Sequence, residues 1–206
     1  MALHMVDHPL AKHLLAGLRD LTTPPDKFRQ FADTLSTILI LEATRSLRSH
    51  AGEVETPLEV THAHRLGQGL AVVPILRAGM SMLDPALRLF PRVSVGFVGL
   101  ERSHETATAH SYYCNLPDLK GLFTLCCDPM LATGGSASQA ISLLKEGGAE
   151  QVVMVCVVCA PEGVAKLEAD HPDVPVFTAA LDSGLNDQKY IVPGLGDYGD
   201  RLYGTE

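Results

Sequence analysis

The sequence lacks several features that would assign it to a large class of proteins. No apolar stretch reaches the roughly 18–20 residues of a membrane-spanning helix, so we expect no transmembrane segment and no membrane partner. The first residues do not combine a charged stretch with an apolar core, which predicts no secretory signal and a cytoplasmic location. Clusters of lysine and arginine are missing, and the formal net charge is −8, which argues against nucleic acid as the main partner.

Two nucleotide-binding motifs are absent or incomplete. The pattern G-x-x-x-x-G-K-[ST] does not occur, which excludes a nucleoside-triphosphate P-loop. Gly194, Gly196 and Gly199 match the pattern G-x-G-x-x-G, but only seven residues follow Gly199. Because no strand–helix–strand unit can follow, these glycines predict an irregular loop with exposed backbone groups rather than a dinucleotide site.

The five cysteines all lie between Cys114 and Cys159, and Cys156 and Cys159 form a C-x-x-C pattern. A redox pair or a metal site is one interpretation. The pattern lies in an apolar run, however, and no second C-x-x-C exists. We therefore interpret these cysteines as buried thiols, which behave as small hydrophobic residues.

The chain has 206 residues, of which 46% are apolar, and these values predict a single globular domain over 1–206. A helical segment is expected over 1–50, with one apolar stripe at residues 10–18 and a second helix that has Thr23 as N-cap and Pro24 at its first position. Apolar runs then alternate with helical patterns. Strands are expected at 70–73, 93–98, 122–127, 151–159 and 174–180. This alternation predicts an α/β fold with a parallel sheet covered by helices on both faces.

The most informative segment is the nine residues 128–136, Asp-Pro-Met-Leu-Ala-Thr-Gly-Gly-Ser. They follow the expected strand 122–127 and precede an amphipathic helix, so a carboxylate lies at a strand end and a glycine turn opens a helix. Glycines let several N–H groups converge, and a helix N-terminus favours an anion. A phosphate could bind the turn while Asp128 accepts hydrogen bonds from hydroxyl groups. This arrangement suits a ribose 5-phosphate.

Segment 128–136 resembles the ribose-phosphate signature of the type I phosphoribosyltransferases, and in detail that of the uracil phosphoribosyltransferase family. Pro129 stands where most of the superfamily has a second acid. The resemblance implies a type I core with a helical N-terminal segment and a small base-binding hood over 182–206. It also implies that this segment binds 5-phosphoribosyl 1-diphosphate through Asp128, Pro129, Met130, Leu131, Ala132, Thr133, Gly134, Gly135 and Ser136.

Two arginines follow expected strands. From the residues alone, Arg77 is equally well a ligand-facing side chain or a surface ion-pair member. Its string Pro-Ile-Leu-Arg-Ala-Gly resembles the family's diphosphate-binding loop, and Arg102 matches the second diphosphate-contacting arginine. The stretch 103–113 resembles the loop that closes over the substrate. We expect His104 to be a solvated loop residue rather than a catalytic acid.

The segment 190–200 resembles the family's base-binding string, except that Tyr198 replaces the usual alanine. The resemblance implies that backbone groups of Ile191, Gly196 and Tyr198 hold uracil, while Asp197, beside the base, faces the phosphoribosyl diphosphate. If the Tyr198 ring pointed inward, it would crowd the pocket.

The reaction that the resemblance implies is uracil plus 5-phosphoribosyl 1-diphosphate giving UMP and diphosphate. Arg77, Arg102, Asp128 and Asp197 would be catalytic, with Mg²⁺ bound mainly through the diphosphate and not directly by the protein. A homodimer or homotetramer is expected, and some relatives respond to a purine-nucleotide effector such as GTP. Two alternatives stay open: a phosphoribosyltransferase for another nucleobase, and a nucleotide-sensing regulator on the same fold that binds RNA.

Overall fold

A computed structural model describes residues 1–102 and 109–205. Its central sheet has the strand order β1-β12-β10-β8-β4-β6-β7, with β5 also paired to β4. All neighbouring strands are parallel except β6 and β7. The strands are β1 (Leu3–Met5), β4 (Leu70–Leu76), β5 (Ser94–Val95), β6 (Phe97–Arg102), β7 (Ala109–Asn115), β8 (Phe123–Cys127), β10 (Gln151–Val155) and β12 (Val176–Thr178). The α/β fold with a mostly parallel sheet is therefore confirmed.

The central strands are apolar on both faces because each face is covered by helices. In β4, Leu70 and Val72 belong to one core cluster, whereas Ala71 and Val73 belong to the other. Alternate side chains of a strand point to opposite faces, so a strand buried on both faces must be apolar at every position.

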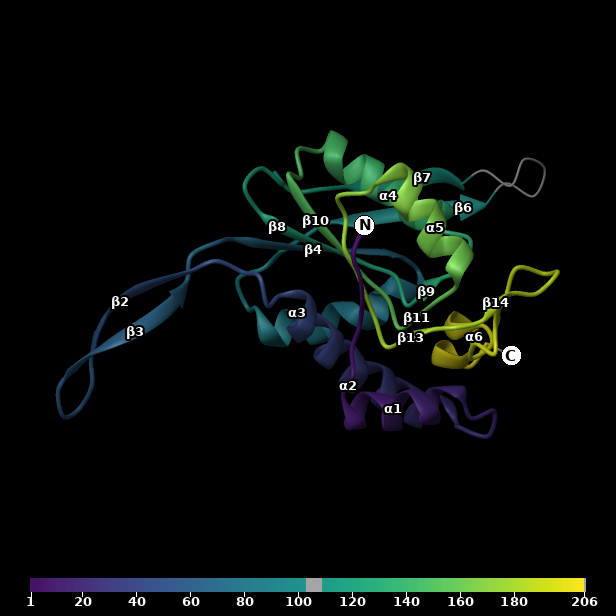
Figure 1. The fold of residues 1–206 in the computed structure, drawn as a ribbon, viewed down its shortest axis with the longest axis horizontal. Coiled ribbons are helices and arrows are strands. Elements are labelled where there is room, and N and C mark those ends of the chain that lie inside the picture. Colours follow the sequence, from purple (N-terminus) through teal and green to yellow (C-terminus); the bar gives the residue numbers. More distant parts are fainter. Residues whose placement is uncertain (103–108, 206) are drawn as a thin grey trace.

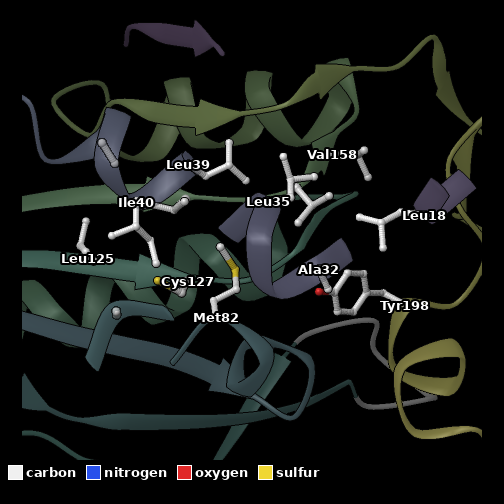
Figure 2. Close-up of a cluster of buried hydrophobic side chains, with 14 of the residues drawn as sticks. Leu18, Ala32, Leu35, Leu39, Ile40, Met82, Leu125, Cys127, Val158 and Tyr198 are labelled. Atoms are coloured by element: carbon white, nitrogen blue, oxygen red, sulfur yellow. The ribbon is translucent and has the colours of Figure 1, made fainter. Parts of the chain in front are cut away.

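Helices cover the two faces of the sheet as separate layers (Figure 1). Helices α1 (Pro9–Arg19), α2 (Pro25–Ala43), α3 (Leu83–Leu89) and α6 (Tyr198–Tyr203) contribute to the first cluster. Helices α4 (Gly135–Glu146) and α5 (Pro161–Asp170) contribute to the second. Figure 2 shows the first cluster, in which Leu35, Leu39 and Ile40 of α2 lie near Met82 and Leu125.

Smaller elements complete the fold. Strands β9 (Met130–Leu131), β11 (Val158–Cys159) and β13 (Ala180–Leu181) form a parallel three-stranded sheet, and β14 (Gly184–Leu185) pairs with β15 (Ile191–Val192). The 3₁₀ helix η1 (Ala78–Met82) follows β4. Strands β2 (Ser49–Glu55) and β3 (Val60–Leu66) form a hairpin that extends away from the body (Figure 1). In the part of the chain that the structure describes, no helix is long and apolar enough to cross a membrane.

Several local predictions were wrong. Helix α2 begins at Pro25 with Pro24 as N-cap, and the Thr23 hydroxyl instead donates to the Gly17 carbonyl of α1 at 2.7 Å. The N-terminal segment also contains β1, which pairs with β12. The run 174–180 breaks between β12 and β13. Finally, 109–113 belong to strand β7, not to a loop, whereas Ser103 and His104 lie outside the described residues.

The expected strand 151–159 also divides, into β10 and β11. The reason is a bulge: the N–H groups of Val157 and Val158 both donate to the Pro129 carbonyl, at 2.9 and 3.1 Å. Val157 and Val158 therefore lie opposite one residue, Pro129, as in a β-bulge, and the chain bends there. The bend lets β11 pair with β9, which is part of segment 128–136.

Candidate active site

A cavity of about 340 Å³ lies at the carboxyl edge of the sheet, the edge where open parallel sheets bind ligands. One wall comes from Ala78 after β4 and from Asp128 and Met130 after β8. The opposite wall comes from the C-terminal segment, including Ile191 and Gly196. The cavity therefore joins the 128–136 segment to the segment predicted to hold a base.

The turn between β8 and α4 has the geometry of an anion cradle. The Met130 N–H donates to Asp128 Oδ1 at 3.3 Å, which tightens the turn after the strand. Gly134, the N-cap of α4, has φ +80°, a left-handed conformation that glycine adopts without strain. Because this N-cap has no side chain, it leaves the first N–H groups of α4 to other acceptors, and the helix dipole favours an anion there.

Helix α5 supports this turn from behind through a close glycine contact. A Cβ atom on Gly163 would lie 2.6 Å from the Ala132 carbonyl oxygen and 2.8 Å from that of Leu131. A Cβ atom on Gly134 would lie 2.8 Å from the Gly163 carbonyl oxygen. Only glycine fits these positions without a backbone shift. Sequence reasoning did not place Gly163 at the site, because the contact joins two elements that are far apart in the chain.

Arg77 and Asp128 follow neighbouring strands, because Pro74 of β4 is in register with Cys127 of β8. Arg77 is exposed at the start of η1, and the Leu76–Arg77 peptide bond is cis. A Cβ atom on Gly79 would lie 2.4 Å from the Cys127 carbonyl oxygen, so the turn packs directly against the end of β8.

Arg102 ends strand β6, whose Gly99 is in register with Leu76 of the parallel strand β4. The carboxyl ends of parallel strands lie at one edge of a sheet. The structure therefore brings the backbone of Arg102 to the same edge as Arg77 and Asp128.

The C-terminal wall is an irregular loop followed by a short helix, as its glycines predict. Gly194 and Gly196 have φ +56° and +80°, and the Val192–Pro193 bond is cis. Asp197 is the N-cap of α6, and its Oδ1 accepts from the Asp200 N–H at 3.0 Å. The side chain that caps the helix thus also lines the cavity.

The Tyr198 ring packs into the core beside the cavity. The ring is 2% exposed and lies edge-on to Phe28, with centroids 5.2 Å apart. Its hydroxyl lies 3.0 Å from Ser81 Oγ (Figure 2 shows the ring at the edge of the core). Burial raises the pKa of Tyr198, so the hydroxyl keeps its proton near neutral pH. Tyr198 borders the cavity, yet about 340 Å³ stays open.

Two other features, the C-x-x-C cysteines and a second hollow, lie outside the cavity described above. The C-x-x-C cysteines are buried, as predicted, and burial raises the pKa of Cys156 well above its ordinary value. A larger hollow of about 990 Å³ is lined by His4, Arg45, Glu150 and Phe177, among others. None of the predicted site residues lines this hollow, whereas Asp128, Asp197 and Tyr198 line the smaller cavity.

A comparison with solved structures identifies the fold. A phosphoribosyltransferase from Corynebacterium diphtheriae aligns with a TM-score of 0.53 at 16% identity, covering 84% of this chain and 96% of that chain. At this identity the likeness shows the fold alone. The fold, with a glycine turn after β8 and a cavity at the carboxyl edge, is that of a type I phosphoribosyltransferase.

The family follows from closer relatives. The family model described as uracil phosphoribosyltransferase matches residues 5–205, so the chain belongs to the uracil phosphoribosyltransferase family. A uracil phosphoribosyltransferase of Shouchella clausii (strain KSM-K16) is 48% identical over 205 residues, which cover 98% of both chains. The structure of the AQ2163 protein from Aquifex aeolicus aligns with a TM-score of 0.91 at 39% identity, covering 99% of both chains.

Proposed function

We propose that the protein transfers the phosphoribosyl group of 5-phosphoribosyl 1-diphosphate to uracil, which gives UMP and diphosphate. One observation carries the proposal: a single cavity joins Asp128, at the start of the predicted phosphate turn, to Ile191, Gly196 and Tyr198. Membership of the uracil phosphoribosyltransferase family supports the same assignment.

The donor would bind at the sheet edge. Its 5-phosphate would accept hydrogen bonds from the turn 130–136 and the start of α4, where N–H groups and the helix dipole favour an anion. Asp128 would accept hydrogen bonds from the ribose hydroxyls. Arg77 and Arg102 would neutralise the diphosphate, for which a planar guanidinium that forms paired hydrogen bonds is well suited.

The base would bind against the C-terminal wall. Uracil is small and flat, with alternating carbonyl and N–H edges, so the backbone groups of Ile191, Gly196 and Tyr198 could pair with it. The volume of about 340 Å³ lies within the roughly 300–1,000 Å³ of small-molecule sites. Since the Tyr198 ring packs against Phe28, backbone recognition at this position stays sterically open.

In the reaction, the bond from ribose C1 to the diphosphate oxygen breaks while a bond from C1 to uracil N1 forms, and the proton of N1 passes to the released diphosphate or to the solvent. C1 gains positive charge, as in glycoside cleavage. Arg77 and Arg102 would stabilise the negative charge that moves to the leaving diphosphate. Asp128 and the phosphate turn would hold the ribose in place, and Asp197 would face the donor from the opposite wall.

The site also fits a Mg²⁺ ion that arrives with the donor. Two carboxylates, of Asp128 and Asp197, line the cavity. Mg²⁺ prefers oxygen ligands and usually keeps several waters, which can donate hydrogen bonds to carboxylates. Among residues 1–102 and 109–205, no group of three or more His, Cys, Asp or Glu side chains could hold a metal. We propose that the diphosphate is the main ligand, and that the ion would help to neutralise the leaving group.

Further properties belong to the same proposal. We place the protein in the cytoplasm, as one domain over 1–206 with a base-binding segment over 182–206. It would work as a homodimer or homotetramer under the influence of a purine nucleotide such as GTP. Its net charge of −8 disfavours nucleic acid as a partner.

The experiment that tests the function measures diphosphate release with Mg²⁺ and 5-phosphoribosyl 1-diphosphate. Uracil is compared with cytosine, orotate, hypoxanthine and no base. Turnover with uracil alone supports the proposal. Turnover only with another base keeps the mechanism but overturns the substrate. Silence with every base, both with and without added GTP, in a protein that binds the donor contradicts the proposed enzyme and points to a sensor.

A further inference from the structure

Arg19, the last residue of α1, forms a paired contact with Asp182, although 163 positions separate them. Its Nη1 donates to Asp182 Oδ2 at 2.9 Å and its Nη2 to Oδ1 at 2.5 Å. Nη1 also donates to the Gly194 carbonyl at 2.8 Å, and the Gly194 N–H donates to Asp182 Oδ2 at 2.9 Å. Both backbone polar groups of Gly194 are therefore held by one ion pair.

This ion pair is largely withdrawn from water. The Asp182 side chain is 4% exposed and the Arg19 side chain 25%. Removing one member of a buried pair leaves the other charged and without its partner, which is strongly unfavourable. The pair is therefore much more than a surface salt bridge, which contributes little to stability.

Asp182 also connects the two walls of the cavity. Its own N–H donates to the Cys159 carbonyl at 2.8 Å, and Cys159 is in register with Leu131 in the neighbouring strand β9. Its carboxylate holds Gly194, which lies two residues before Gly196 of the base wall. Asp182 thus connects segment 128–136, through β11, to the C-terminal wall of the cavity.

A second arginine, Arg201, holds Leu195, the residue that follows Gly194. Arg201 of α6 donates through Nη1 to the carbonyls of Leu195 and Leu18, and through Nη2 to the Asp20 carbonyl at 2.5 Å. The end of α1 and the loop 194–195 are therefore joined by two independent guanidinium groups. The backbone of the loop is therefore restrained at two adjacent residues, Gly194 and Leu195.

We propose that Arg19 and Asp182 are positioning residues for the base: they fix Gly194 so that the backbone groups of the base wall point into the cavity. Neither residue lines the cavity, so they act through Gly194 and do not contact substrate. The inference rests on the proposed function, since it assigns the base to this wall.

The test compares Arg19→Gln and Asp182→Asn with the unchanged protein. Loss of a charge-assisted contact predicts that the KM for uracil rises about tenfold or more. The kcat at saturating uracil and the dissociation constant of 5-phosphoribosyl 1-diphosphate should stay within about twofold. Arg19→Lys keeps the charge but loses the paired geometry. Its KM for uracil should therefore lie between that of the unchanged protein and that of Arg19→Gln. Arg45→Gln, which breaks an exposed ion pair with Glu42, is the matched control and should change nothing.

A second measurement is independent of turnover. Hydrogen exchange followed by mass spectrometry should show faster exchange at 183–199 in both variants, with 123–146 unchanged. Unchanged exchange at 183–199 would overturn the proposal. A dissociation constant of 5-phosphoribosyl 1-diphosphate that rises as much as the KM for uracil would overturn it as well. If a different base is the substrate, the proposed function fails while the same comparison with that base still decides the role of Arg19. If Asp182→Asn does not fold, Arg19→Lys and Arg19→Gln supply the comparison.

Discussion

Tyr198 and Ser81 lie 117 positions apart, yet their hydroxyl oxygens are 3.0 Å apart. The Ser81 hydroxyl donates its one hydrogen bond to the Ala78 carbonyl, at 2.9 Å. Tyr198 is therefore the donor in its hydrogen bond with Ser81. Ala78 directly follows Arg77 and lines the cavity. A chain of hydrogen bonds therefore runs from the C-terminal wall of the cavity to the turn that carries Arg77.

Tyr198→Phe removes this donor and keeps the ring against Phe28. We expect the free energy of unfolding to fall by about 1 kcal/mol, the usual net value of one hydrogen bond. Urea denaturation measures this difference. Tyr203→Phe is the control, because Tyr203 is 50% exposed and should show almost no change. Equal stabilities of the two variants would contradict the hydrogen-bond chain.

Arg77→Ala should lower turnover or donor affinity by about tenfold to a hundredfold, since a charge-assisted contact contributes about 1.5–3 kcal/mol. Steady-state kinetics with varied 5-phosphoribosyl 1-diphosphate measures the effect. Arg88→Ala is the comparison, because Arg88 pairs with Asp33 on the exposed surface. An unchanged rate and KM in Arg77→Ala would remove Arg77 from the diphosphate site.

Asp128→Asn should lower kcat/KM by about tenfold or more and leave the fold intact. The amide keeps the shape of the side chain but loses the negative charge that would strengthen the hydrogen bonds donated by the ribose hydroxyls. Circular dichroism monitors the fold alongside the kinetics. Asp118→Asn, on the exposed surface, should behave like the unchanged protein. A fully active Asp128→Asn would exclude Asp128 from the mechanism.

Gly163→Ala should raise the KM for the donor, because the new Cβ would push the carbonyls of Ala132 and Leu131 out of place. Overpacking of this kind costs about 1–3 kcal/mol of stability. Gly52→Ala is a matched control in the hairpin, where a Cβ would have no atom within 4 Å. The structural explanation fails if both variants keep the same donor KM.

One cysteine should react quickly with a thiol reagent at pH 8 in the native protein, and all five should react in denaturant. Cys114 is exposed, whereas Cys126, Cys127, Cys156 and Cys159 are buried. Burial raises the pKa of Cys127 to about 12 and holds that of Cys126 well above its ordinary value, so the reactive thiolate is scarce there. Mass spectrometry identifies the labelled residue, and a second fast thiol would show that the core opens readily.

The features that the sequence predicts well are local. The strand 122–127, the turn after it and helix α4 appear as expected, because strand pattern, glycine turn and helix periodicity adjoin one another in the chain. The break between β10 and β11 could not be predicted. It depends on the Pro129 carbonyl, which belongs to another part of the sheet.

The candidate site shows the same division. The residues of segment 128–136 and Arg77 can be found from motifs, but the direction of the Tyr198 ring depends on Phe28, 170 positions earlier. The Arg19–Asp182 pair has no signal in the sequence, because an arginine at the end of a helix is common and favourable with the helix dipole. Contacts between distant segments decide these features, and they become visible only in the folded chain.

The two walls of the cavity are made at different times during synthesis. The ribosome completes the turn after β8 at residue 136 and reaches the C-terminal wall of the cavity, which lies beyond residue 182, only afterwards. A nascent chain therefore contains the turn after β8 before it contains any residue of the C-terminal wall. Translation that stops before residue 182 would yield a chain that has the residues of the turn after β8 and none of those of the C-terminal wall.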